Sequence, residues 1–124
     1  MGAVPLALIL GSVALSAAAQ VLLKLGVTAV RGRLPVDATV TSTVIAAFVD
    51  PAVIGGLGLY AVGAVLWIGA LSRADLSQAY PFVGLGFVLT SAIGYALLGE
   101  TLNAGRLAGT ALVVLGVVVI AGAG

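Results

Sequence analysis

Four long apolar segments dominate this chain, and each is about as long as a bilayer is thick. They cover approximately residues 4–30, 52–71, 76–98 and 104–121. An α-helix rises 1.5 Å per residue, so about twenty residues cross the roughly 30 Å of hydrocarbon in a membrane. The segments therefore predict an all-α integral membrane protein with four transmembrane helices, forming a single domain over residues 1–124. Most connections are short, so sequential helices should be antiparallel.

The composition excludes a water-soluble domain. Hydrophobic residues make up 62% of the 124 residues, and five basic with four acidic side chains are too few to cover a soluble surface. The chain has no cysteine or histidine, which removes disulfides, thiolate chemistry and the commonest metal ligands. We therefore expect no metal, no cofactor and no enzymatic activity. The net charge of +1 gives no indication of a nucleic-acid partner, and we expect none.

The first segment carries a polar stripe. Ser12, Ser16, Gln20 and Lys24 are spaced by four residues, which keeps them near one face of a helix. For Ser12 we favour interhelical hydrogen bonding. The other three either line a transport pathway or have the same packing role, because polar residues inside membranes are often functional. A cleaved signal peptide ending near Ala17–Ala19 is an alternative, but no basic region precedes the run and further spans follow it.

Residues 31–50 are the least apolar part of the chain and predict an aqueous loop. Within them, Thr39–Val49 is mildly hydrophobic but too short to cross a membrane. It is either an interfacial helix or a helical lead-in to the second span. Asp50 and Pro51 predict a helix start, with Asp50 as the N-cap and Pro51 at the first helical position.

The second span has one face of small and aromatic residues. Gly56, Tyr60, Gly63, Trp67 and Ala70 follow each other at steps of three and four. Such a face either packs against a neighbouring helix or leaves a groove for a ligand. For Tyr60 we favour the groove. Trp67 lies near the helix end, so an interfacial aromatic belt is the favoured alternative there.

The third span combines polar residues with features that weaken a helix. Gln78 and Tyr80 lie just inside it, and Pro81 removes one backbone hydrogen bond and should loosen the preceding turn. Gly84 and Gly86 follow, where they weaken the helix further or let another backbone come close. We interpret this span as the moving, pathway-lining helix of a small transporter, with Pro81, Gly84 and Gly86 as its hinge.

The fourth span has a side suited to tight helix pairing. Gly105, Gly109 and Gly116, together with Leu112, form this side. Four helices of about twenty residues hardly enclose a passage for a sizeable solute. The protein should therefore act as a dimer or larger assembly, with this side of the fourth helix as the interface.

The basic residues are unevenly divided between the two membrane faces. Lys24, Arg31, Arg33 and Arg106 lie at one face, and Arg73 alone lies at the other. The positive-inside rule then places both termini outside the cytoplasm, and insertion in both orientations is the alternative. We expect the protein in the inner (plasma) membrane.

Several short motifs resemble the small four-helix members of the drug/metabolite transporter superfamily. They are Ala19-Gln20 with Lys24, Ala79-Tyr80-Pro81 with Gly84, Leu98-Gly99-Glu100, and the run from Gly109 to Gly116. Two branches compete: the small multidrug resistance exporters, and the EamA-type proteins that include the flippase subunits for undecaprenyl-phosphate-aminoarabinose. Gln20 with Lys24 and Ala79-Tyr80-Pro81 are closer to the second branch. The resemblance implies a four-helix fold, alternating access, and a homodimer or heterodimer that is often antiparallel.

The first functional hypothesis is translocation of a lipid-linked sugar or similar amphiphile of the polyprenyl-phosphate type. Lys24 and Arg106 would hold the anionic phosphate near one face, since basic side chains are common phosphate partners. The lipid tail would stay in the bilayer, and polar side chains of the spans would hydrogen-bond the head. These side chains are Ser16, Gln20, Gln78 and Tyr80.

Two alternatives remain. A small multidrug-type exporter of organic cations needs a titrating carboxylate within the membrane. Resemblance to the exporter branch implies a functional glutamate in the first span, where this chain has Ser16. Glu100 would then have to be the titrating carboxylate, but it lies at a helix end. The other alternative is an accessory membrane subunit with no transport activity of its own, in which the polar residues only hold helices together.

Overall fold

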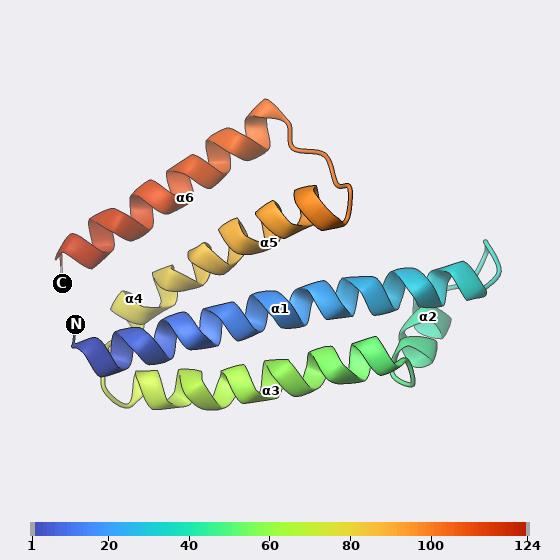
Figure 1. The fold of residues 1–124 in the computed structure, drawn as a ribbon, viewed down its shortest axis with the longest axis horizontal. Coiled ribbons are helices and arrows are strands. Elements are labelled where there is room, and N and C mark those ends of the chain that lie inside the picture. Colours follow the sequence, from blue (N-terminus) through green and yellow to red (C-terminus); the bar gives the residue numbers. More distant parts are fainter. Residues whose placement is uncertain (1, 124) are drawn as a thin grey trace.

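The computed structural model describes residues 2–123, and every regular element in that range is helical (Figure 1). Four stretches are long and apolar enough to cross a membrane, as the sequence predicted. Three of these four spans are single helices, and the third span along the chain is divided into three pieces. The elements are α1 (Ala3–Arg33), α2 (Val40–Ala47), α3 (Pro51–Leu71), α4 (Leu76–Ala79), the 3-10 turn η1 (Tyr80–Phe82), α5 (Val83–Leu97) and α6 (Ala104–Ala123).

The spans lie in the order α3, α1, α5, α6, with α1 as the central helix (Figure 1). The helices α1 and α3 are antiparallel and pack along most of the length of α3. On its other side α1 contacts α5, and α6 packs mainly against α5 and η1. Both chain ends lie at the same end of the bundle, because the four spans alternate in direction.

Small residues let the backbones of α1 and α3 approach closely. A side-chain carbon at Gly56 would lie 3.0 Å from the carbonyl oxygen of Ala19, so only glycine fits there without a shift. Further along, the hydroxyl of Ser12 donates a hydrogen bond of 2.9 Å to the carbonyl oxygen of Gly63. This buried bond is the interhelical contact that the sequence predicted for Ser12, and it fixes the register of the two helices.

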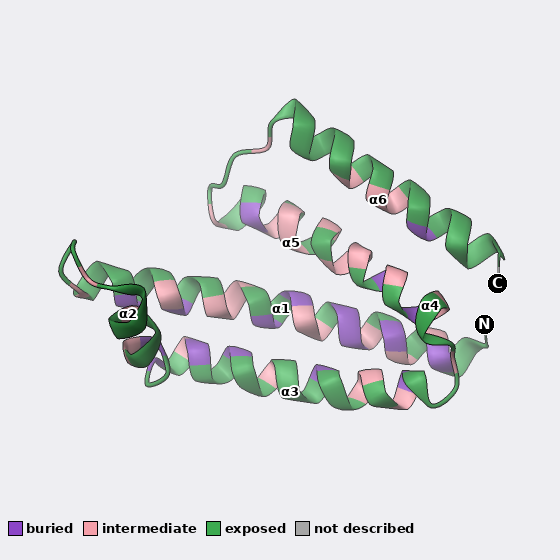
Figure 2. Cartoon of the chain, turned by 180° about the vertical axis from the view of Figure 1, so that it is seen from behind, coloured by how far each residue is buried: buried purple, intermediate pink, exposed green. Residues whose placement is uncertain are grey.

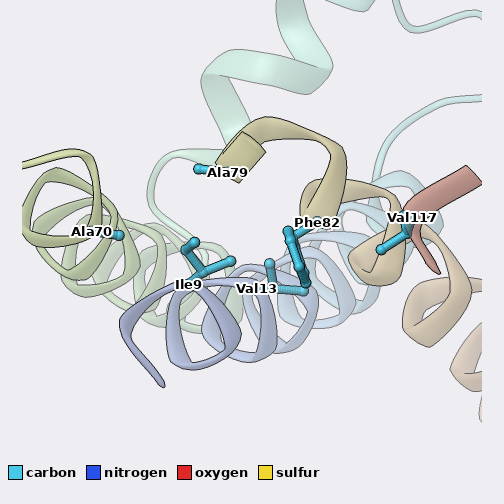
Figure 3. Close-up of a cluster of buried hydrophobic side chains, with 6 residues drawn as sticks. All are labelled: Ile9, Val13, Ala70, Ala79, Phe82 and Val117. Carbon is cyan, nitrogen blue, oxygen red and sulfur yellow. The ribbon is translucent and has the colours of Figure 1, made fainter. Parts of the chain in front are cut away.

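Burial is concentrated on α1 (Figure 2). One cluster of buried side chains joins α1 to the other spans near the end of the bundle that holds both termini. Phe82 of η1 points onto Val13 of α1, and Val117 of α6 lies on its other side (Figure 3). Among the described residues of α6, Val117 alone is buried, so this helix is held by few contacts. The complete cluster is Ile9, Val13, Ala70, Ala79, Phe82 and Val117.

The third span is interrupted where the sequence places Pro81. The α-helix α4 stops at Ala79, a single 3-10 turn covers Tyr80–Phe82, and α5 then continues to Leu97. Proline has no amide hydrogen, so it cannot complete the α-helical hydrogen-bond ladder at this point. The sequence predicted a looser helix one turn before Pro81. In the structure the backbone instead winds into a tighter 3-10 turn around the proline.

Asp50 joins the end of α1 to the start of α3. Its carboxylate accepts hydrogen bonds from the amides of Ala52 (2.9 Å) and Val53 (3.3 Å), which confirms the predicted N-cap. The other oxygen lies 3.3 Å from a guanidinium nitrogen of Arg33. Burial tends to raise the pKa of Asp50, but the amide of Val53, the Arg33 guanidinium and the amide of Ala52 outweigh it, and the pKa lies below its ordinary value.

We expect Asp50→Ala to lower the thermal unfolding midpoint, because it removes the cap of α3 and the partner of Arg33. Since the pKa of Asp50 is lowered in the folded protein, its stabilising effect is present above the unfolded pKa of about 4 and is lost as the pH falls through the folded value. The difference between wild type and variant should therefore shrink on acidification.

A matched control for this experiment is Asp75→Ala. Asp75 precedes α4 in the same N-cap position but makes no capping side-chain hydrogen bond, so its loss should leave the midpoint nearly unchanged. Equal effects of the two variants, or a difference independent of pH, would show that the Asp50 carboxylate is not the stabilising group.

Candidate functional site

A groove of about 400 Å³ lies over α1, between α3 and the third span. It forms because α3 and α5 both pack against α1 but barely meet each other. The floor comes from α1, one wall from α3 and the other from η1 and α5. The lining comprises Ser12, Val13, Ser16, Ala17, Gln20, Tyr60, Ala64, Trp67, Tyr80, Val83, Gly86, Phe87 and Thr90.

The polar stripe of α1 forms part of this floor. Ser12, Ser16 and Gln20 all line the groove, as their spacing of four residues requires if they share one helix face. The hydroxyl of Ser12 is already committed to Gly63, whereas Ser16 is half-buried and Gln20 is exposed. Lys24 continues the stripe by one further turn, but it is exposed and lies outside the lining. The stripe therefore leads from an uncharged groove to a single cation.

Aromatic side chains line the walls. Tyr60 and Trp67 both face the groove from α3, so the structure places Trp67 in the lining rather than solely in an interfacial belt. Trp67 meets Tyr80 of η1 edge to face, with ring centroids 6.3 Å apart and planes inclined by 74°. This pair connects the two walls close to the turn between α3 and α4. Both rings line the groove, and each carries a polar group.

The two glycines predicted as hinges lie at different helix contacts. Gly86 lines the groove, and a side-chain carbon there would come within 3.4 Å of Val13 on α1. Gly84 faces α6 instead, where such a carbon would lie 2.7 Å from a methyl of Val113. Each glycine thus accommodates a neighbouring helix. Bending at these residues and at Pro81 stays a prediction.

Sequence reasoning missed the part of the lining that follows Tyr80. Val83, Phe87 and Thr90 lie on the same face of the third span as Tyr80, at steps of three and four residues. The sequence contains this spacing, but these residue types are common in transmembrane helices and did not indicate a binding site. Thr90 supplies a polar atom, although its hydroxyl also donates to the carbonyl of Phe87 at 3.0 Å.

Three other predicted binding residues lie outside the groove. Gln78 is half-buried in α4 and does not reach the lining. Glu100 follows α5, where its amide donates to the carbonyl of Gly94 at 3.0 Å and its carboxylate folds back over Gly94. Arg106 is exposed at the start of α6 and donates to the carbonyl of Thr101 at 2.6 Å.

The groove can therefore bind a ligand by hydrogen bonds and aromatic contacts, but not by charge. Its polar groups are hydroxyls, one amide and the indole of Trp67, and no acidic or basic residue contributes to the lining. A mostly apolar wall with a few uncharged polar groups suits the head of an amphiphile that carries hydroxyls.

The side of α6 predicted as a dimer interface is unpartnered within this chain. Nothing lies within 4 Å of a side-chain carbon built on Gly109 or Gly116, and Leu112 is exposed. Gly105 lies beside Asn103, whose side chain caps the helix by accepting from the amide of Arg106. The surface is thus free to meet a second molecule.

Four apolar spans, one of them interrupted, and a groove between them define a small multi-pass membrane protein of transporter type. No family model and no solved structure matches the chain.

Comparison with curated proteins gives the family. The chain is 34% identical over 113 residues to a protein of Erwinia tasmaniensis named as a probable 4-amino-4-deoxy-L-arabinose-phosphoundecaprenol flippase subunit ArnF, covering 90% of this chain and 89% of the relative. A probable subunit ArnE of Pseudomonas savastanoi is 36% identical over 56 residues, 45% of this chain and 49% of the relative. The uncharacterised protein y4nH of Sinorhizobium fredii is 31% identical over 125 residues and matches over the full length of both chains.

The chain belongs to the family of small membrane proteins that contains these ArnE and ArnF subunits. This confirms the resemblance predicted from the motifs in the first, third and fourth spans, and it favours the EamA-type branch over the multidrug exporters.

Proposed function

We propose that this chain is a subunit of a carrier that moves a lipid-linked sugar, or a similar amphiphile of the polyprenyl-phosphate type, across the inner membrane by alternating access. The observation that carries the proposal is the uncharged groove of α1, α3 and α5, with the exposed Lys24 one turn beyond its polar floor on α1. The names of the relatives, which refer to a sugar-phosphate lipid, support the same ligand class.

The groove and Lys24 would share the two parts of the head. Hydroxyls of the sugar would bond to Ser16, Gln20 and Tyr80 and lie against Trp67. Lys24 lies four residues beyond Gln20, a rise of about 6 Å, which suits a phosphate attached to a sugar in the groove. The chain of the lipid would stay in the bilayer. Flexing at Pro81 would open the groove to alternate sides.

An exporter of organic cations finds less support. Such a carrier needs a carboxylate in its binding site, where the cation and protons compete. The lining holds none, and Glu100 lies against Gly94 at the end of α5. We also infer that the subunit is a carrier component rather than an enzyme, in line with the names of its relatives.

The subunit would work as a dimer, with a second copy or with a related small subunit. The exposed side of α6 offers the contact, since Gly109 and Gly116 leave it flat enough for close helix approach. Relatives of two subunit types, ArnE and ArnF, make a heteromeric pair as reasonable as a homodimer. Substrate-binding roles for Gln78, Glu100 and Arg106 would then depend on rearrangement or on the partner.

Both termini would lie outside the cytoplasm. Arg31 and Arg33 lie at the C-terminal end of α1, and Arg106 lies at the start of α6. Lys24 lies near the same membrane face. The turn between α3 and α4 at the opposite face carries Arg73 alone. Basic residues accumulate on the cytoplasmic side of membrane proteins, so the face with four of them should be internal.

Gln20→Ala and Lys24→Ala should each slow transfer of a fluorescent polyprenyl-phosphate sugar across liposomes that contain the protein. The loss of one hydrogen bond or one charge contact should reduce the rate about five-fold. Arg73→Ala removes a basic group at the opposite membrane face, away from the groove, and should have little effect. Unchanged rates in Gln20→Ala and Lys24→Ala would leave the polar stripe with a packing role only.

Leu112→Cys should give covalent dimers in native membranes when treated with a short bifunctional maleimide. Leu112 lies near the middle of α6 on its exposed side, so two copies meet there whether they are parallel or antiparallel. Val117→Cys is the control, because Val117 is buried against the rest of the chain and should not cross-link. Only monomers with Leu112→Cys, in membranes where the protein is active, would rule out a homodimer through this surface.

Single cysteines also test the orientation, because the natural chain has none. A maleimide that cannot cross membranes should label Ser72→Cys in intact spheroplasts and should label Val36→Cys only after permeabilisation. Both positions are exposed, so reactivity reports the side of the membrane. Labelling of both in intact cells would show insertion in two orientations and contradict the proposed topology.

A further inference from the structure

A second cavity lies outside the groove, at the end of α1. It has a volume of about 340 Å³ and is formed by Arg31 of α1, the loop that follows, and Thr43 of α2. None of its lining residues belongs to the groove. It thus needs an explanation separate from the transported ligand.

The length of α1 places this cavity at the membrane surface. With 31 residues α1 is about 46 Å long, whereas a bilayer core is roughly 30 Å thick and α3 has 21 residues. The cap of α3 meets α1 at Gly26, because a side-chain carbon there would lie 2.8 Å from the Asp50 carboxylate. The last two turns of α1, residues 27–33, therefore extend about 10 Å beyond the start of α3.

The helix α2 packs on this extension with one side only. Ala47 joins Val30 and Val53 in a buried cluster, with Ala46 beside them. The other side exposes large apolar residues: Val40 is 81% exposed, Ile45 66% and Phe48 60%, and Val44 lies between them on the helix surface. In water this would be an unfavourable apolar patch, but at the boundary between headgroups and acyl chains it would be buried in lipid.

One unpaired basic group lines the cavity itself. Arg33 is held by Asp50, whereas Arg31 has no ion-pair partner among residues 2–123. The exposed Asp37 is outside the cavity lining, and the four charges of residues 31–50 cancel. Attraction to a membrane would therefore come from a local contact of Arg31, whose planar guanidinium can bond two phosphate oxygens, rather than from net charge.

We propose that Arg31 and α2 form a binding site for an anionic phospholipid of the surrounding membrane. Its phosphate lies in the cavity at Arg31, and its acyl chains lie along Val40, Val44, Ile45 and Phe48. The bound lipid holds α2 at the membrane surface and braces the extended end of α1. On this proposal residues 39–49 form an interfacial helix rather than a helical lead-in to the second span.

The first test is native mass spectrometry of the purified protein with phosphatidylglycerol or phosphatidylcholine. Wild type should retain phosphatidylglycerol preferentially, and Arg31→Gln should reduce its retention about five-fold, the effect of one surface arginine. Arg73→Gln removes the same charge at the opposite face and should retain lipid as wild type does. Equal retention by Arg31→Gln and Arg73→Gln, with unchanged helical circular dichroism, would overturn the site.

The second test measures the depth of α2 in vesicles of phosphatidylglycerol and phosphatidylcholine. A spin label on Ile45→Cys should be accessible to oxygen and protected from a water-soluble nickel reagent, whereas a label on Asp37→Cys, in the exposed loop before α2, should show the reverse. An Ile45 label in contact with the nickel reagent would place α2 in water. A label shielded from both reagents would show that a protein covers α2. Either result would refute the lipid site.

Discussion

The close packing of α1 against α3 is the contact on which the rest of the structure depends. Gly56 lets the two backbones approach closely, and the hydrogen bond from Ser12 to Gly63 links them. Asp50 caps the start of α3 and pairs with Arg33 at the C-terminal end of α1. Because this pair is fixed, α5 has to pack on the remaining side of α1. The groove exists because α3 and α5 both pack against α1 but barely contact each other.

The distribution of charge follows from the cost of placing ions in hydrocarbon. Charged groups lie at span ends or in loops, and the groove contains only neutral polar groups and aromatic rings. A ligand with an uncharged polar head and an anionic link to a lipid would meet these groups in the same order along α1. Such a division would let a small membrane protein bind a charged amphiphile without burying a charge of its own.

The sequence predicted the spans, the Asp50 cap and the family, because each depends on local pattern or on motif similarity. It also placed Ser16, Gln20, Tyr60 and Tyr80 on the faces that line the groove. It could not show that Gly84 meets α6 or that Glu100 folds back over Gly94, since periodicity identifies a helix face but not the neighbour of that face. The sequence did not single out Phe87 and Thr90, because their place in the lining depends on how the neighbouring helices pack.

The weak attachment of α6 has a consequence for biosynthesis. This helix follows the other three spans along the chain, so α1, α3 and the third span can already be packed when it leaves the ribosome. With Val117 as its only buried residue among those described, α6 gains little from its own subunit. Most of the surface of α6 therefore has no contact within the chain when the helix enters the membrane. Newly inserted chains can first meet each other at that time. Association with a second chain can then begin during membrane insertion, before the folded monomer accumulates.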